Sequence, residues 1–227
     1  MERFREMIRR LPARVEFLIV VVWAFGQLIF ASILSIGSLS AEAYSNDALI
    51  SLLIGELLQF AFLVWFLKVR GWTPGKLSLN FTIRGTALGL GLAVATYAMF
   101  IVLQLAAVHW LPIEMKTAAA SYPQASKELD LQVVFIASAV NGVYEELFVA
   151  GYVITALSPV RGPWVAINVS TGIRLLCHLY QGPIGILTIV PMGILYGWVY
   201  VRTRALWPLI VAHILLDVVG LAYSATN

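Results

Sequence analysis

The stretch Asn141-Gly142-Val143-Tyr144-Glu145-Glu146-Leu147-Phe148 places two adjacent carboxylates in the middle of an apolar segment. A charged side chain at the centre of a bilayer costs about 2.5–3.5 kcal/mol on insertion scales. Ionisable residues are therefore rare in membrane spans and usually serve a function there. Glu145 and Glu146 are accordingly the first candidates for a functional site, and their partners must come from other segments of the chain.

The composition indicates an integral membrane protein. Of the 227 residues, 60% are hydrophobic and 12% are charged, and the mean hydropathy is +0.87. A soluble domain of this length needs more polar surface than these values allow. The length fits about seven spans with short loops, so residues 1–227 form a single integral membrane domain. We therefore predict an all-α fold, a polytopic bundle of transmembrane helices.

Seven apolar segments are candidates for these spans. The first follows five arginines and has no small-residue cleavage site before Ser40, so we interpret it as a retained span and not as a signal peptide. The segments are Phe17–Leu39, Ala48–Leu67, Thr86–Trp110, Leu131–Leu157, Trp164–Leu179, Ile184–Val201 and Leu206–Ala222. Two glycine pairs, Gly85 with Gly89 and Gly193 with Gly197, have the four-residue spacing that suits close helix packing in lipid.

The basic residues orient the chain in the membrane. With the N-terminus in the cytoplasm, 12 of the 15 Lys and Arg residues fall on the cytoplasmic side, at the N-terminus and near Lys68–Arg84, Arg161 and Arg202–Arg204. Acidic residues such as Asp47 and Asp130 fall on the opposite side. The positive-inside rule therefore predicts a cytoplasmic N-terminus. The same distribution accounts for the net charge of +3 without a nucleic-acid partner.

Few other ionisable residues lie within the predicted spans. Arg174 and His178 are four residues apart, as are His213 and Asp217, so each pair shares one face of a helix. Counted at about 1.5 Å per residue from the cytoplasmic ends, the Glu pair and these residues lie roughly 12–22 Å deep. They can therefore converge near the middle of the membrane. Alternatively, the polar groups of each pair could be satisfied locally, without contacts to other spans. Glu56 in the second span could be either a packing contact or part of the site.

Two carboxylates and two histidines at similar depth support several kinds of chemistry. A carboxylate can act as a general base toward water, and a histidine can share the proton or donate a hydrogen bond to a developing oxyanion. Together these groups describe amide hydrolysis. The same residue types can bind zinc, although the His-Glu-x-x-His spacing of helical zinc proteases is absent. Buried Glu, His and Asp also serve as proton relays, so a proton-coupled transporter is an alternative.

Three motifs in separate spans resemble the CAAX protease and bacteriocin-processing family, also called Abi-type intramembrane glutamic endopeptidases. That family has Glu-Glu followed by an aromatic residue and an Arg, then Phe-x-x-x-His, then His-x-x-x-Asn. The corresponding segments here are Glu145–Tyr152, Arg174–His178 and His213–Asp217. Their order and spacing agree with the family, so the helices over residues 131–222 would carry the catalytic motifs.

The resemblance implies an intramembrane protease that hydrolyses peptide bonds with a Glu-activated water and without a metal or other cofactor. Glu145 would activate the water with help from His178, and His213 would stabilise the oxyanion. The supporting residues would be Glu146, Arg174 and Asp217. The substrate would be a membrane-associated peptide or protein segment, and the short loops favour a bacterial plasma membrane. The sequence does not decide whether the substrate is prenylated, or what the oligomeric state is.

Three residues depart from the family pattern. Ala150 stands in place of the Arg, Arg174 in place of the Phe, and Asp217 in place of the Asn. We hypothesise that Arg174 replaces the missing arginine as the partner of Glu146. An ionised Asp cannot donate a hydrogen bond as Asn does, so Asp217 is expected to orient His213 and not to contact the oxyanion. These departures leave a non-catalytic scaffold or immunity-type membrane protein of the same fold as an alternative.

Overall fold

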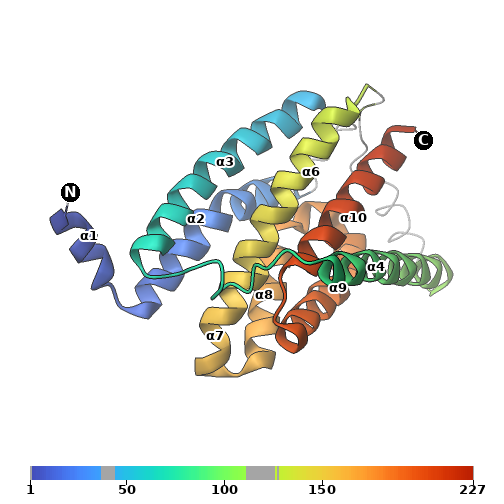
Figure 1. Ribbon diagram of the computed structural model, residues 1–227. Helices are drawn as coiled ribbons and strands as arrows, with labels where there is room; N and C mark the ends of the chain where they lie inside the picture. Colours follow the sequence, from blue (N-terminus) through green and yellow to red (C-terminus); the bar gives the residue numbers. More distant parts are fainter. Residues whose placement is uncertain (1, 37–43, 111–125, 127, 227) are drawn as a thin grey trace.

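The computed structural model describes residues 2–36, 44–110, 126 and 128–226, and every regular element in these ranges is a helix (Figure 1). The all-α prediction is therefore confirmed. The elements are α1 (Glu2–Arg9), α2 (Ala13–Leu34), α3 (Asn46–Val69), α4 (Ile83–Trp110), α6 (Leu131–Glu145), the π-helical segment η1 (Glu146–Tyr152), α7 (Val153–Arg161), α8 (Pro163–Cys177), the 3₁₀ turn η2 (Leu179–Gln181), α9 (Gly182–Thr203) and α10 (Trp207–Thr226).

Six helical segments of the described chain are long and apolar enough to cross a membrane. They are α2, α3, α4, α9, α10 and the continuous run Leu131–Arg161, which contains α6, η1 and α7. They correspond to six of the seven predicted spans, although the predicted end of the first span at Leu39 lies outside the described residues. The chain is therefore a multi-pass membrane protein.

The predicted fifth span, Trp164–Leu179, is the shorter helix α8. It has 15 residues and a length of about 22 Å, compared with a hydrocarbon core of about 30 Å. Gly162, with φ +84°, turns the chain sharply from α7 into α8. At the other end the backbone of His178 leaves the helical conformation, and Gly182, with φ +63°, directs the chain from η2 into α9. The short helix therefore ends next to His178.

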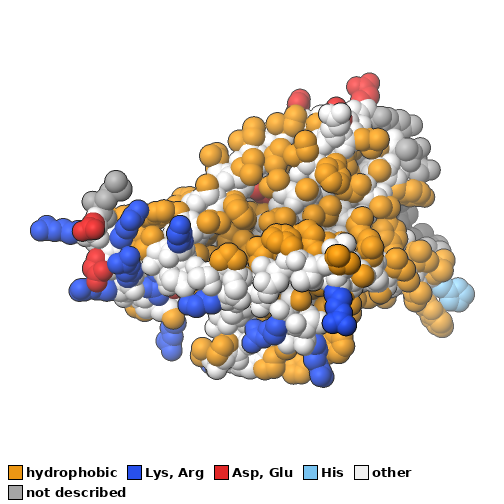
Figure 2. All heavy atoms as spheres, viewed as in Figure 1, with side chains coloured by type: hydrophobic (Ala, Val, Ile, Leu, Met, Phe, Trp, Pro, Cys, Tyr) orange, Lys and Arg blue, Asp and Glu red, His pale blue; other side chains and the backbone are white. Residues whose placement is uncertain are grey.

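The two ends of the bundle differ in charge. At one end the Arg70 guanidinium forms an ion pair with Glu16 and donates to the carbonyl oxygen of Ile8 at 3.0 Å, which joins α1, α2 and α3. The Leu206 N–H donates to the Ser78 carbonyl at 3.0 Å, so the α9–α10 turn lies beside the loop after α3. Figure 2 shows most Lys and Arg side chains on this basic end, and acidic side chains on the opposite, acidic end, where α3 and α6 begin. The positive-inside rule places the basic end in the cytoplasm.

Glycines allow several helices to pack closely. A Cβ at Gly89 of α4 would lie 2.8 Å from a backbone oxygen of α10, and a Cβ at Gly193 of α9 would lie 2.9 Å from the Thr171 side chain of α8. Gly85 and Gly197 extend the same two contacts. The packing role predicted from the four-residue spacing is therefore confirmed.

Candidate active site

The Glu pair lies at the point where α6 changes into the π-helical segment. Glu145 is the last residue of α6, and Glu146 is the first residue of η1. Side chains of neighbouring helical residues point about 100° apart, so the two carboxylates have different surroundings. All seven residues of η1 are buried. Short π-helical segments often occur at functional sites, and the sequence did not predict this one.

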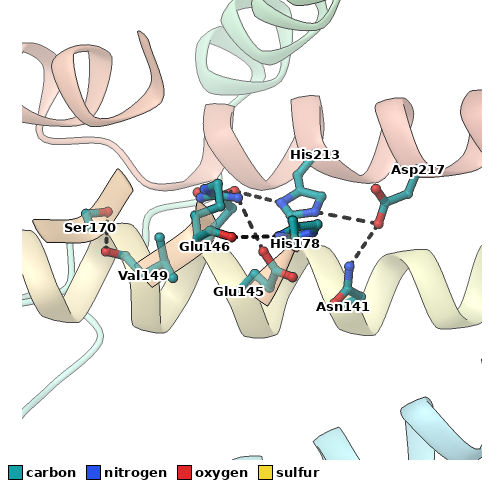
Figure 3. Close-up of polar contacts among 9 residues, drawn as sticks. Asn141, Glu145, Glu146, Val149, Ser170, His178, His213 and Asp217 are labelled. Atoms are coloured by element: carbon teal, nitrogen blue, oxygen red, sulfur yellow. Dashed lines mark hydrogen bonds and ion pairs between the residues drawn. The ribbon is translucent and has the colours of Figure 1, made fainter. Parts of the chain in front are cut away.

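Glu146 is fully buried and joins three helices. Its Oε1 accepts a hydrogen bond from Arg174 Nη2 at 2.8 Å and another from His213 Nδ1 at 2.7 Å (Figure 3). Arg174 belongs to α8 and is 1% exposed, and His213 belongs to α10. A buried carboxylate needs such partners to offset the loss of hydration. The hypothesised ion pair between Arg174 and Glu146 is therefore present.

Glu145 contacts the same guanidinium but also borders a cavity. Its Oε2 lies 3.3 Å from Arg174 Nη1, which is longer than the corresponding contact of Glu146. Glu145 lines a cavity of about 670 Å³ together with His178, His213 and Asp217. Figure 3 shows the Glu145 side chain pointing toward the two histidines. The structure thus brings all six predicted site residues together, with Glu146 behind the cavity wall.

Each histidine has one ring nitrogen engaged by an acceptor. His178 Nδ1 lies 2.8 Å from the carbonyl oxygen of Arg174, and since a carbonyl oxygen only accepts, Nδ1 carries a proton. In the neutral ring, Nε2 of His178 is then a hydrogen-bond acceptor. Nδ1 of His213 donates to Glu146 in the same way, and its Nε2 lies 3.6 Å from Asp217 Oδ2. Asp217 therefore faces His213, as their spacing predicts.

Asn141 is a polar residue of the site to which the sequence reasoning gave no role. Its Nδ2 donates to Asp217 Oδ2 at 2.9 Å, and its side chain lines the same cavity. Asn141 lies four residues before Glu145, so both share one face of α6. That spacing was the signal available in the sequence. Since an Asn amide has two N–H donors, one remains after the bond to Asp217.

Glu56 of α3 is a further buried carboxyl close to the site. It is 3% exposed, and among the described residues neither of its oxygens has a hydrogen-bond partner. Glu56 interacts electrostatically with the charged residues of the site, yet it is not among the residues that line the cavity. Gln59, one turn further along α3, bonds instead to Gln27 and Tyr144, which makes it a packing contact between helices.

Gly142 allows α10 to approach α6 closely enough for His213 to reach Glu146. A Cβ at this position would lie 2.8 Å from Ile214 Cγ1 and 3.3 Å from the Ile214 backbone nitrogen. We expect Gly142→Ala to move α10 away from α6, since a backbone atom cannot move alone, and to destabilise the protein by about 1–3 kcal/mol. The measurement is the unfolding temperature in detergent.

Gly91→Ala is the matched control for this substitution. Gly91 lies within α4, and a Cβ there meets nothing within 4 Å. This variant should keep or raise the unfolding temperature, because Ala favours a helix over Gly by about 1 kcal/mol. If both variants unfold at the wild-type temperature, the close contact at Gly142 does not hold α10 in place.

The fold and these contacts define a class: a polytopic membrane protein in which a buried Glu-Glu-Arg-His cluster opens onto a cavity. Residues 127–219 match the family model of type II CAAX prenyl endopeptidase Rce1-like proteins. This segment contains the whole cluster and Asn141. No curated protein and no solved structure matches the chain. In the part of the chain that carries the three predicted motifs, the protein thus resembles the CAAX protease family, and this match supports a membrane protease at the level of the family.

Proposed function

We propose that the protein is a glutamic-type intramembrane endopeptidase, which hydrolyses a peptide bond of a membrane-associated substrate with a water activated by Glu145. The observation that carries this proposal is the position of Glu145 on the cavity wall with His178 and His213, while Glu146 is fully buried. Of two adjacent carboxylates, only the first borders space for a substrate. We propose that the reaction needs no metal, and that the short loops reflect a bacterial plasma membrane.

In the proposed reaction Glu145 acts as the general base. It takes one proton from a water in the cavity while the water oxygen attacks the carbonyl carbon of the substrate. His178 Nε2 accepts a hydrogen bond from the same water, because Nδ1 already donates to the Arg174 carbonyl. When the C–N bond breaks, the proton held by Glu145 passes to the leaving amine. The products are a carboxylic acid and an amine.

His213 is the proposed donor to the oxyanion. With both ring nitrogens protonated, Nδ1–H donates to Glu146 and Nε2–H is available on the side of Asp217 and the cavity. Removal of one oxyanion donor from an enzyme costs about 2.7–4 kcal/mol of transition-state stabilisation. Asp217 orients the ring, and Arg174 compensates the charge of Glu146. On the basis of these contacts, we propose that Asp217, Arg174 and Glu146 position the catalytic groups.

The test is cleavage of a candidate membrane peptide by the purified protein in detergent. Loss of a proton-transfer group typically lowers the rate by about 10²–10⁴-fold, so Glu145→Ala and His178→Ala should abolish detectable cleavage. Glu128→Ala, which removes an exposed carboxylate at the acidic end, should cleave as the wild type does.

Three other outcomes would point elsewhere. Unchanged cleavage in either site variant would remove this mechanism. A biological function that persists in Glu145→Ala would favour the scaffold alternative. Loss of cleavage on treatment with a chelator would indicate a metal hydrolase instead of a metal-independent protease.

A further inference from the structure

We propose that Glu56 is a positioning residue of the site, which stays protonated within the bundle and binds an internal water together with Ser138 and Asn141. The role of Glu56 in catalysis rests on the proposed protease function. The protonation of Glu56 and the bound water do not depend on that function, and they can be tested without a substrate.

Glu56 is a buried carboxyl group that the proposed reaction does not use. It lies within α3 and is 3% exposed, and neither of its oxygens has a hydrogen-bond partner among the described residues. Burial of a carboxylate without a cation or a donor is strongly disfavoured, so a carboxyl group in such surroundings keeps its proton. Glu146 differs in this respect, because Arg174 and His213 both donate to it. The neutral Glu56 still has an O–H donor that needs an acceptor.

The contacts between α3 and α6 place Glu56 at the depth of Asn141. The two helices lie side by side (Figure 1) and begin together, where the Asp130 N–H donates to Asn46 Oδ1 at 3.0 Å. Glu56 comes ten residues after this contact along α3, and Asn141 comes eleven residues after it along α6. At about 1.5 Å per residue, both residues lie about 15–16 Å from the common start of the helices.

Glu56 also faces α6, next to the wall of the cavity. Leu52 lies one turn earlier on the same face of α3 and lines the cavity. Phe60 lies one turn later on this face, and its ring packs against the ring of Tyr144 with the centroids 6.4 Å apart. Since Glu56 lies between these two residues of α3, its carboxyl group is in the seam between α3 and α6, directly behind the cavity wall.

Two polar residues of α6 near this seam have free hydrogen-bonding capacity. Ser138 is 2% exposed and lines the cavity, and its hydroxyl has no hydrogen-bond partner among the described residues. Asn141 uses one of its two N–H donors for Asp217 and retains the other. Buried waters typically make about three hydrogen bonds to groups of this kind. One water can accept from the Glu56 O–H and the Asn141 amide, and donate to the Ser138 hydroxyl.

This water connects Glu56 to the residues that orient His213. Asn141 donates to Asp217 at 2.9 Å, and Asp217 lies 3.6 Å from His213 Nε2. Glu56 interacts electrostatically with Glu145 and Asp217, so an ionised Glu56 would repel both of these groups. A protonated Glu56 can hold the water and add no negative charge to the site. The proposed role is therefore to keep Asn141 in the position from which it holds Asp217.

Infrared spectroscopy of the purified protein tests the protonation of Glu56. The probe is the C=O stretch of a protonated carboxylic acid, measured at neutral pH as the difference between the wild type and Glu56→Gln. Gln is neutral and keeps the volume of the side chain. We expect an acid band that is lost in Glu56→Gln and that shifts in D₂O, because the acid proton exchanges. Glu128→Gln, at an exposed position, is the matched control and should change carboxylate bands only.

The frequency of the same band tests the water. Ser138→Ala removes one partner of the water, so the hydrogen bonding of the Glu56 acid group and the frequency of its band should change. Ser158→Ala is the control, because its buried hydroxyl also has no partner among the described residues but lies in α7, away from Glu56. A carboxylate band in place of the acid band would overturn the proposal. So would an acid band with the same frequency in Ser138→Ala and the wild type.

Cleavage assays test the role in catalysis. Glu56→Leu cannot hold the water, and its kcat should fall about 3–10-fold, which corresponds to the loss of about one hydrogen bond. KM should stay the same, because Glu56 does not line the cavity. Glu56→Gln should recover most of the loss, since its amide N–H can donate to the same water.

The outcomes separate this inference from the protease function. An equal loss of kcat in Glu56→Gln and Glu56→Leu, or a loss of cleavage caused by a higher KM, would overturn the positioning role. If the acid band is present and responds to Ser138→Ala but the wild type cleaves no peptide, the protease function fails, while the protonated Glu56 and its water stand.

Discussion

Arg174→Met is expected to destabilise the protein by about 3–5 kcal/mol, because it leaves buried carboxylates without their cation. The guanidinium is 1% exposed and lies 2.8 Å from Glu146 and 3.3 Å from Glu145. Glu146 has no access to water that could replace this partner, since it is 0% exposed. Met retains much of the apolar volume of the arginine stem. The decrease in the free energy of unfolding should therefore come mainly from the loss of the positive charge. The measurement is the free energy of unfolding in detergent.

The double variant Glu146→Gln/Arg174→Met should lose much less stability than the sum of the two single variants. Gln keeps an acceptor for His213 Nδ1–H while it removes the charge, and neutral replacement of a buried ion pair is often nearly neutral for stability. The coupling is expected to be about 0.5–3 kcal/mol. Arg84→Met, at an exposed position, is the control and should stay within about 0.5 kcal/mol of the wild type. Additive effects would contradict the hypothesis that Arg174 is the partner of Glu146.

The spans were predictable because membrane helices follow the local hydropathy of the chain. Where the observed helix ends differ from the predicted ones, contacts between residues far apart in the sequence are the cause. The first span was predicted from Phe17, whereas α2 begins at Ala13 and includes Glu16. Glu16 is buried because it pairs with Arg70 and accepts a hydrogen bond from Trp72, and a local pattern does not contain these partners. The end of α8 at Cys177 lies two residues before the predicted end at Leu179, because the backbone leaves the helical conformation at His178.

The candidate site was predictable where its geometry is local. Helical periodicity is enough to place His213 and Asp217 on one face, and the resemblance to the family assigned different roles to the two acids. The contact between Asn141 and Asp217 joins residues 76 positions apart, so no local pattern indicates it. The π-helical segment and the approach of α10 at Gly142 likewise depend on packing between helices.

Glu145→Gln and Glu146→Gln should separate catalysis from stability, although they make the same chemical change at adjacent positions. Glu145→Gln removes the proposed general base, so the cleavage rate should fall by about 10²–10⁴-fold. Its unfolding temperature should stay close to that of the wild type, because Glu145 borders the cavity and makes the longer contact to Arg174, at 3.3 Å. Gln also keeps the volume of the side chain.

Glu146→Gln should act mainly on the fold. It weakens two buried hydrogen bonds, to Arg174 at 2.8 Å and to His213 at 2.7 Å, and hydrogen bonds to charged groups contribute about 1.5–3 kcal/mol each. Any loss of cleavage should therefore accompany a lower unfolding temperature. Rates and unfolding temperatures are measured in the same detergent. If Glu145→Gln keeps its activity and Glu146→Gln loses activity without losing stability, the two carboxylates exchange their proposed roles, and the water must be activated from behind the cavity wall.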